Sequence, residues 1–152
     1  MAGLSAGHVA ALAVADAVLR DARKPWWVIA GAAVALHTRE PIVVDDIDIL
    51  LAVEDVPLVA ALSGIVRREC DGHALFRSDF YAAVAIGTVT IEFMAGFRSN
   101  RQGLWCDVWP RTRIFVPIGN LSVPTPCPDE LIEMLAAFGR PKDLARAALL
   151  AG

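Results

Sequence analysis

Two stretches decide the fold: Trp-Trp-Val-Ile-Ala-Gly-Ala-Ala-Val-Ala-Leu-His at residues 26–37, and Asp-Ile-Asp-Ile-Leu-Leu at residues 46–51. The first opens with an apolar run of strand length that stops at Gly31, and its alanine-rich remainder predicts a short helix over residues 32–37. The second alternates acidic and apolar residues before it becomes wholly apolar, which predicts a strand with one polar end. Together they predict a strand, a glycine turn, a helix and a second strand.

Further elements are predicted on either side of these stretches. Capping residues and hydrophobic spacing indicate helices, and short apolar runs bounded by turn residues indicate strands. Gly87-Thr88 separates two such runs in the way a tight hairpin turn does, whereas residues 96–110 show no assignable pattern. The predicted elements are a helix that begins at Ser5, passes through Leu19 and ends in the basic run 20–24, a helix over residues 55–62, a helix that ends at Gly139, a helix that begins at Pro141, strands over residues 81–86 and 89–94, and short extended pieces at 113–116 and 121–123.

Length and composition indicate one domain. The 152 residues contain no internal repeat and no long polar linker, so we expect a single domain over residues 1–152. With 56% hydrophobic and 20% charged residues, the chain is apolar for a soluble monomer. Part of its surface is therefore expected to be buried against a protein partner or a second copy in a homodimer.

Hydropathy, cysteine content and net charge indicate the cellular compartment and the kinds of partner. No stretch reaches the roughly eighteen apolar residues that a spanning helix needs, and the best candidate, Val9–Leu19, is short and carries Asp16. Three widely separated cysteines indicate reduced thiols, so a cytoplasmic protein with no membrane association is expected. The net charge of −3 gives no basic surface of the kind that binds a polyanion, and nucleic acid is not indicated.

Three acidic residues form the candidate chemical site. Residues two apart on a strand face the same way, so Asp46 and Asp48 project together while Ile47 points to the opposite side. Two carboxylates that close raise each other's pKa unless a cation neutralises them. Glu92 is a lone acid in an apolar strand, and it is expected to join the pair if its strand is a neighbour.

Three carboxylates on adjacent strands would offer the oxygen ligands that Mg²⁺ or Mn²⁺ prefers. Such a site suits phosphoryl or nucleotidyl transfer, in which bound cations clamp the attacking and leaving oxygens. The alternative, left open by spacing alone, is that Asp46 and Asp48 start a strand at a solvent edge and that Glu92 is an isolated surface acid.

The glycine turn favours the site over this alternative. A helix that opens at Ala32 directly after Gly31 presents unpaired backbone N–H groups and the positive end of its dipole, which attract phosphate. Arg39, in the loop before the acids, could reach a phosphate as a forked cation, and Lys142 sits at the positive end of the last helix, where an anionic partner would explain it. Solvated surface charge is the other interpretation of both cations.

The residues Val28-Ile29-Ala30-Gly31-Ala32-Ala33, followed by Asp46-Ile47-Asp48-Ile49-Leu50, resemble the signature of the nucleotidyltransferase superfamily. The chain looks most like its minimal, stand-alone prokaryotic members, which include antitoxin and abortive-infection types. Several of these also end in a proline-rich lead, a helix and a sequence similar to residues 139–144. The resemblance implies an α/β (α+β) fold with a mixed sheet flanked by helices and with helices at the C-terminus.

The resemblance also implies roles for the candidate residues. Asp46, Asp48 and Glu92 match the family's metal-binding and catalytic acids, with Mg²⁺ or Mn²⁺ as the cofactor, and Gly31 and Ala32 match the turn that holds the phosphates of an NTP, with ATP expected first. The family often has serine after the glycine, and the alanine here leaves that contact to the backbone.

Two functions follow. One is metal-dependent transfer of a nucleotide from an NTP to a hydroxyl on a small molecule, RNA or protein. The other is a catalytically degenerate binding module or antitoxin-like partner. A nuclease is disfavoured because no lysine follows Glu92 by two residues, and a glycosyltransferase is disfavoured by the short chain.

Overall fold

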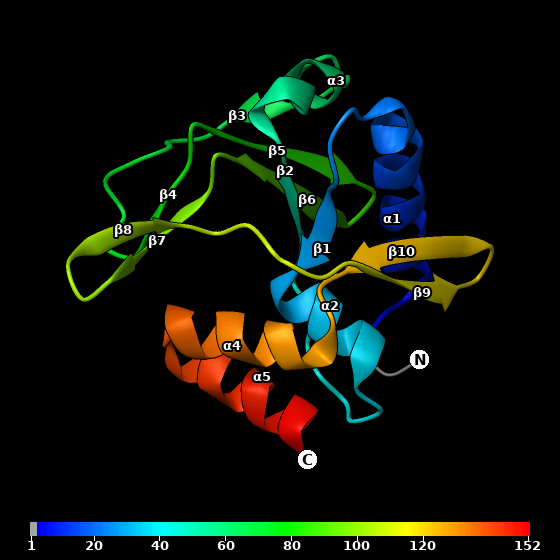
Figure 1. Cartoon of the computed structure of the whole chain (residues 1–152). Coiled ribbons are helices and arrows are strands. Elements are labelled where there is room, and N and C mark those ends of the chain that lie inside the picture. The colour runs from blue at the N-terminus through cyan, green and yellow to red at the C-terminus, as the bar shows by residue number, and fades with distance from the viewer. Residues whose placement is uncertain (1–2) are drawn as a thin grey trace.

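A five-stranded mixed sheet organises the computed structural model, which describes residues 3–152 (Figure 1). The strand order is β1-β2-β6-β5-β3. Strands β2 and β6 run parallel, and the other neighbouring pairs run antiparallel. The strands are β1 Trp27–Ile29, β2 Asp46–Leu51, β3 Val66–Arg67, β5 Phe80–Ile86 and β6 Val89–Ala95. The mixed α/β class expected from the sequence is confirmed.

Five α-helices accompany the sheet. They are α1 Ala6–Val18, α2 Ala30–His37, α3 Val56–Ala60, α4 Pro128–Phe138 and α5 Pro141–Ala151, with short 3-10 turns at Leu19–Asp21 and Val53–Asp55. The capping signals act as expected, because the Ser5 hydroxyl accepts a hydrogen bond from the His8 N–H at the start of α1. Gly139 ends α4 in the left-handed conformation, with φ 75°, and Pro141 occupies the first turn of α5.

The stretch 96–110, which has no assignable sequence pattern, forms a hairpin of β7 Arg98–Arg101 and β8 Leu104–Asp107 that pairs with β4 Phe76–Arg77. Its turn is Gln102-Gly103, and both residues have positive φ, as a two-residue hairpin turn requires. Each strand is four residues long; β7 (Arg-Ser-Asn-Arg) is wholly polar and β8 (Leu-Trp-Cys-Asp) does not alternate, so they carry little periodic signal. A second hairpin joins β9 Ile114–Ile118 to β10 Leu121–Thr125.

The junction between β1 and α2 differs from the prediction, because the helix starts two residues earlier than expected. The helix begins at Ala30, not after Gly31, and Ala30 itself has a φ of 57°. An alanine in this left-handed region costs about 1–2 kcal/mol relative to a helical residue. The turn that precedes α2 therefore stores strain at Ala30, and Gly31 belongs to the first turn of the helix.

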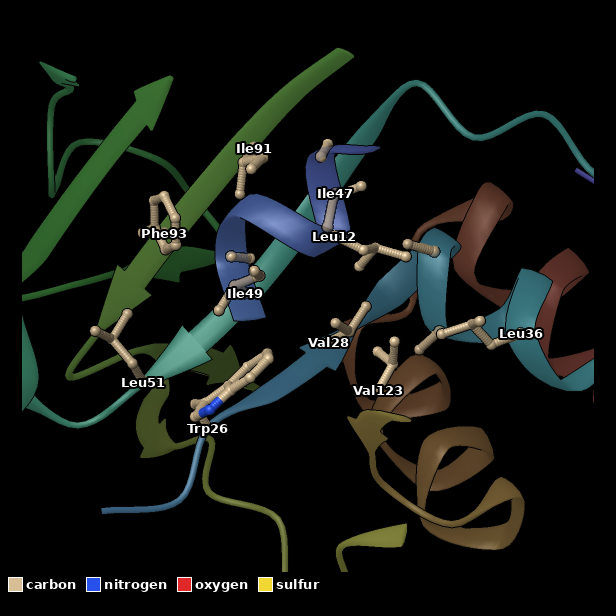
Figure 2. Packing of buried hydrophobic residues seen from close by; sticks show 14 of the residues in the cluster. Leu12, Trp26, Val28, Leu36, Ile47, Ile49, Leu51, Ile91, Phe93 and Val123 are labelled. Carbon is tan, nitrogen blue, oxygen red and sulfur yellow. The ribbon is translucent and has the colours of Figure 1, made fainter. Parts of the chain in front are cut away.

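One face of β2 and β6 is wholly apolar and forms the main core. Ile47 and Ile49 of β2 and Ile91 and Phe93 of β6 are fully buried, and they pack beneath Leu12 of α1 (Figure 2). Their alternation with polar residues follows the two-residue period of a strand. Helix α1 therefore covers this face of the sheet.

The opposite face is apolar at one end only. There Trp27, Leu50 and Met94 form a second cluster with Met134 and Phe138 of α4. The other end of this face carries the acidic residues of β2 and β6. Over residues 3–152, none of the helices has the length and apolar character needed to cross a membrane.

Candidate functional site

The three predicted acids come together on one face of the sheet. In the parallel pairing of β2 and β6, Asp48 lies directly opposite Glu92, and Asp46 lies opposite Thr90. Partners in register on adjacent strands point to the same side, so the three carboxylates share the face opposite to the main core. The requirement that Glu92 lie on the same side as the aspartates is therefore met.

These acids line a cavity of about 600 Å³, a size in the range of small-molecule sites, roughly 300–1,000 Å³. Its floor is the acidic end of β2 and β6, and its walls are the start of α2, the α4–α5 region and the segment from residue 69 to 78. The lining residues are Ile29, Ala30, Gly31, Asp45, Asp46, Asp48, Glu69, Cys70, Asp71, Gly72, His73, Phe76, Arg77, Ser78, Tyr81, Glu92, Met94, Phe97, Phe138, Arg140, Lys142 and Arg146.

Negative charge is concentrated on the cavity floor. Burial raises the pKa of Asp48 well above its usual value, and a hydrogen bond with the Glu92 carboxyl group and the charges of Glu92 and Asp46 raise it further. Burial also raises the pKa of Asp46, with Glu92 as the next contributor. A carboxyl cluster of this kind is stabilised by a cation, because a cation offsets both the burial of the charges and their mutual repulsion, which together raise these pKa values.

One arginine, Arg68, neutralises part of this negative charge. The Arg68 Nη1 atom lies 2.6 Å from Glu92 Oε1, and it donates a longer hydrogen bond of 3.4 Å to the Tyr81 hydroxyl. Arg68 follows β3 at the edge of the sheet. Sequence analysis did not single out Arg68 or Tyr81, because their proximity to Glu92 depends on the pairing of β3 with β5 and of β5 with β6.

The opposite wall of the cavity is basic. A Cβ placed on Gly31 would lie 2.8 Å from Arg146 Nη2, so the guanidinium group of this α5 residue sits directly over the glycine at the start of α2. Lys142, one turn earlier on α5, also faces the cavity. No carboxylate among the described residues lies within ion-pair distance of Arg146 or Lys142. Lys142 was predicted from the sequence; Arg146 was missed, although its spacing of four from Lys142 on a helix was the available signal.

Two other predicted residues lie elsewhere. Arg39 is exposed and does not line the cavity. Ala32 is fully buried in the main core, so only its backbone N–H could take part in a phosphate contact. Asp45, which strand parity places away from the pair, is exposed at the cavity rim.

Aromatic side chains form the end of the cavity furthest along β6. Phe76, Phe97 and Phe138 contact one another, with ring centroids 5.2–6.0 Å apart. The Arg140 guanidinium lies 4.9 Å from the Phe76 ring centroid, and it is held there by two hydrogen bonds to the fully buried Asp143. This end offers an apolar surface beside the charged floor.

The donor set suits a divalent cation in its chemistry, because three carboxylates from adjacent strands supply the hard oxygen ligands that such ions take. The side chains are not arranged as a closed cage: within residues 3–152, no three His, Cys, Asp or Glu side chains are placed to hold an ion together. The Arg68–Glu92 ion pair engages one of the three carboxylates.

The comparisons with known proteins bear on the fold. No protein-family model and no curated protein matches the chain. Among solved structures, a candidate nucleotidyltransferase from Thermotoga maritima, TM1012, superposes with a TM-score of 0.72 at 18% identity, over 88% of this chain and 85% of that one.

Two structures of ANT(2'')-Ia also match. The crystal structure in complex with adenylyl-2''-tobramycin has a TM-score of 0.59 at 16% identity and covers 93% of this chain and 87% of that one. The solution structure of this antibiotic-resistance factor has a TM-score of 0.59 at 15% identity, over 94% and 82% of the two chains. The chain therefore has the nucleotidyltransferase fold, as its sequence resemblance implies.

Proposed function

We propose that this protein is a metal-dependent nucleotidyltransferase that moves a nucleotide from an NTP, ATP first, to a hydroxyl group on a small molecule, RNA or protein. The observation that carries the proposal is the pairing of opposite charges across one cavity. Asp46, Asp48 and Glu92 form its floor, and Lys142 and Arg146 face them from α5 beside Gly31. A triphosphate and its counter-ions need this combination of an acidic and a basic wall.

Each wall has a distinct task in this proposal. The backbone N–H groups at the start of α2 and the two α5 cations bind and orient the phosphates. Asp46, Asp48 and Glu92 would hold Mg²⁺ or Mn²⁺, which when bound supplies charge neutralisation on the phosphate oxygens. The aromatic end of the cavity gives an apolar surface for the nucleobase or the acceptor.

The transfer itself is a substitution at phosphorus. A bond forms between the acceptor hydroxyl oxygen and the α-phosphorus, and the bond from the α-phosphorus to the oxygen that bridges to the β-phosphorus breaks, so pyrophosphate leaves. The hydroxyl proton passes to a carboxylate of the cavity floor. ANT(2'')-Ia, with which the chain shares its fold, has been observed in complex with adenylyl-2''-tobramycin, and this supports a nucleotidyl group as the transferred unit.

A second candidate is a catalytically degenerate binding module or antitoxin-like partner. Two observations favour it: Ala32 offers no hydroxyl to a phosphate, and Glu92 is already paired with Arg68. In this case the protein would act through a fixed protein partner, and the cytoplasmic location proposed for either function would not distinguish the two.

Nucleotide binding tests the proposal. Each of the four NTPs is titrated into the protein with Mg²⁺ and then Mn²⁺, and binding is read by calorimetry and by thermal shift. We expect one NTP to bind, and we expect Asp48→Asn to weaken its binding by at least about tenfold, because loss of a metal ligand should cost no less than loss of a residue that supports one.

The matched control is Asp21→Asn, which removes the same charge from an exposed position outside the cavity and should leave binding unchanged. Absence of binding by the wild-type protein at millimolar NTP with either metal would count against the transferase. Purification of a stable complex with one protein partner, together with that absence, would support the binding module.

A further inference from the structure

Arg68 reaches the acidic floor from the edge of the sheet. Val66 of β3 pairs with Ala83 of β5, and Ala83 pairs with Glu92 of β6, so these residues form one row across the sheet. Arg68 lies two residues beyond Val66 and therefore faces the same side.

The ion pair is well defined at both ends. The Glu92 side chain is only 15% exposed, whereas that of Arg68 is 43% exposed. The Arg68 backbone is fixed, because its N–H donates to the Tyr81 carbonyl oxygen at 2.8 Å. The guanidinium can therefore leave Glu92 by rotation of the side chain alone, without movement of the strand.

Arg67 provides an internal comparison. It is also exposed and also follows Val66, but strand parity turns it to the other face, where its guanidinium lies 4.9 Å from the Phe80 ring centroid. Two adjacent arginines thus differ in one respect that matters here: only Arg68 contacts an acid of the cavity floor.

We propose that Arg68 is the resident counter-cation of Glu92 and that it competes with a divalent cation for this carboxylate, so that the ion enters the site only as the Arg68 side chain swings out. The inference rests on the proposed function, since it concerns the same three acids. Its physical reason is that the guanidinium, 2.6 Å from Glu92 Oε1, neutralises the carboxylate charge and occupies a lone pair that an ion would use. The coupling is reciprocal: the factor by which the ion pair weakens cation binding is also the factor by which the bound cation weakens the ion pair.

Direct Mn²⁺ titration, followed by electron paramagnetic resonance without nucleotide, tests the competition. We expect Arg68→Gln to bind Mn²⁺ roughly fivefold or more tightly than the wild-type protein, the lower end of usual coupling between sites. Arg68→Lys keeps the positive charge and should stay close to the wild-type affinity. Arg67→Gln, the matched control, should not change it, and thermal unfolding of each variant verifies that it folds.

The possible outcomes separate this inference from the proposed function. If Arg68→Gln binds Mn²⁺ no more tightly than wild type while Asp48→Asn abolishes binding, Arg68 is not a competitor and the metal site stands. If neither the wild-type protein nor Arg68→Gln binds Mn²⁺, the competition is refuted. The NTP titrations then decide the proposed function separately.

A second measurement follows Arg68 itself. In the wild-type protein, Mg²⁺ should shift the NMR signal of the Arg68 side-chain Nε–H group as the guanidinium leaves Glu92, and the Arg67 signal should not move. An unchanged Arg68 signal at a Mg²⁺ concentration that saturates the site would show that the ion pair persists beside the ion, and this would overturn the proposal.

Discussion

The two faces of the central sheet differ completely although the same two strands build both. On β2 and β6, residues 47, 49, 91 and 93 are buried beneath α1, while the residues between them, 46, 48 and 92, carry carboxylates into an open cavity. The first face gains stability from the apolar surface it removes from water. The second face concentrates like charges and costs stability unless a cation compensates them. Neighbouring residues of one strand thus serve opposite purposes.

The largest expected loss of stability comes from substituting the core-facing member of two adjacent residues on β6, and its neighbour on the acidic face tests the contrast between the two faces. Phe93→Ala removes a fully buried ring from the main core and should lower the free energy of unfolding by about 3–5 kcal/mol. Glu92→Gln, one residue away on the other face, should change it by less than about 1 kcal/mol, because the lost ion pair has a partner that is well exposed to solvent. Urea unfolding of the two variants measures both effects.

Similar decreases in the free energy of unfolding for the two substitutions would contradict the view that only the apolar face stabilises the fold. A fall of more than about 3 kcal/mol for Glu92→Gln would mean that the Arg68–Glu92 pair is a structural support of the sheet. The view of the acidic face as a surface that gains little from burial would then have to be abandoned.

An intermediate loss of stability is expected at α4, the helix that covers the apolar end of the second face. Glu130 of α4 is 5% exposed, and its carboxylate accepts hydrogen bonds from the N–H groups of Arg111 and Thr112. The Thr112 carbonyl oxygen in turn accepts a bond from the indole of Trp27 on β1. Glu130→Gln should cost roughly 1.5–3 kcal/mol, the usual contribution of hydrogen bonds to a charged group.

This contribution should depend on pH. Burial alone would raise the pKa of Glu130, but the hydrogen bonds from Arg111 and Thr112 outweigh it and lower the pKa below its ordinary value of 4.5. A depressed pKa stabilises the fold fully above the unfolded value and loses this effect as the pH falls through the folded one. The stability difference between wild type and Glu130→Gln should therefore be constant near neutral pH and shrink below about pH 4.5; a constant difference down to about pH 3 would refute it.

The smallest expected effect on stability is at the cavity wall. The Cβ of Gly31→Ala would meet the Arg146 guanidinium, the mobile end of a long side chain, and Gly31 does not need a positive φ. The gain of helix propensity and the displacement of Arg146 should nearly cancel, for a net change within about 1 kcal/mol. NTP affinity should still fall, because Arg146 moves off the start of α2.

A substitution on the exposed side of α5 serves as the control for this helix. Leu144 is 51% exposed and does not line the cavity, so Leu144→Ala should leave NTP affinity unchanged. Equal NTP affinity of Gly31→Ala and wild type would show that Arg146 has no part in phosphate binding.

Local patterns were sufficient for the elements with strong periodicity. The strand over residues 46–51, the hairpin around Gly87-Thr88 and the helix that ends at Gly139 lie where the sequence predicts them. The β7–β8 hairpin was not predictable, because its four-residue strands show no alternation and β7 owes its position to pairing with β4. The start of α2 was misplaced by two residues, since nothing in the sequence marks Ala30 as the residue with positive φ.

The residues of the candidate site also fall into those that the sequence predicts and those that only the structure reveals. Parity along a single strand placed Asp46 and Asp48 together, and their union with Glu92 followed once β2 and β6 proved to be neighbours. Arg68 and Arg146 come from segments distant in sequence from the acids. Helical spacing links Arg146 to Lys142, but no local pattern connects either arginine with the carboxylates. Arg39, chosen for its position in the loop before β2, lies outside the cavity.

By itself, the sequence determined which side chains alternate on each strand, where the strongly patterned helices begin and end, and that acids interrupt an otherwise apolar sheet. These properties depend on neighbours within a few residues and on the fixed periods of strand and helix. Tertiary structure alone decided which cations face those acids. Strand order brings Arg68 to Glu92, and helix packing brings Arg146 over Gly31. Such contacts between distant segments leave no periodic trace in the chain.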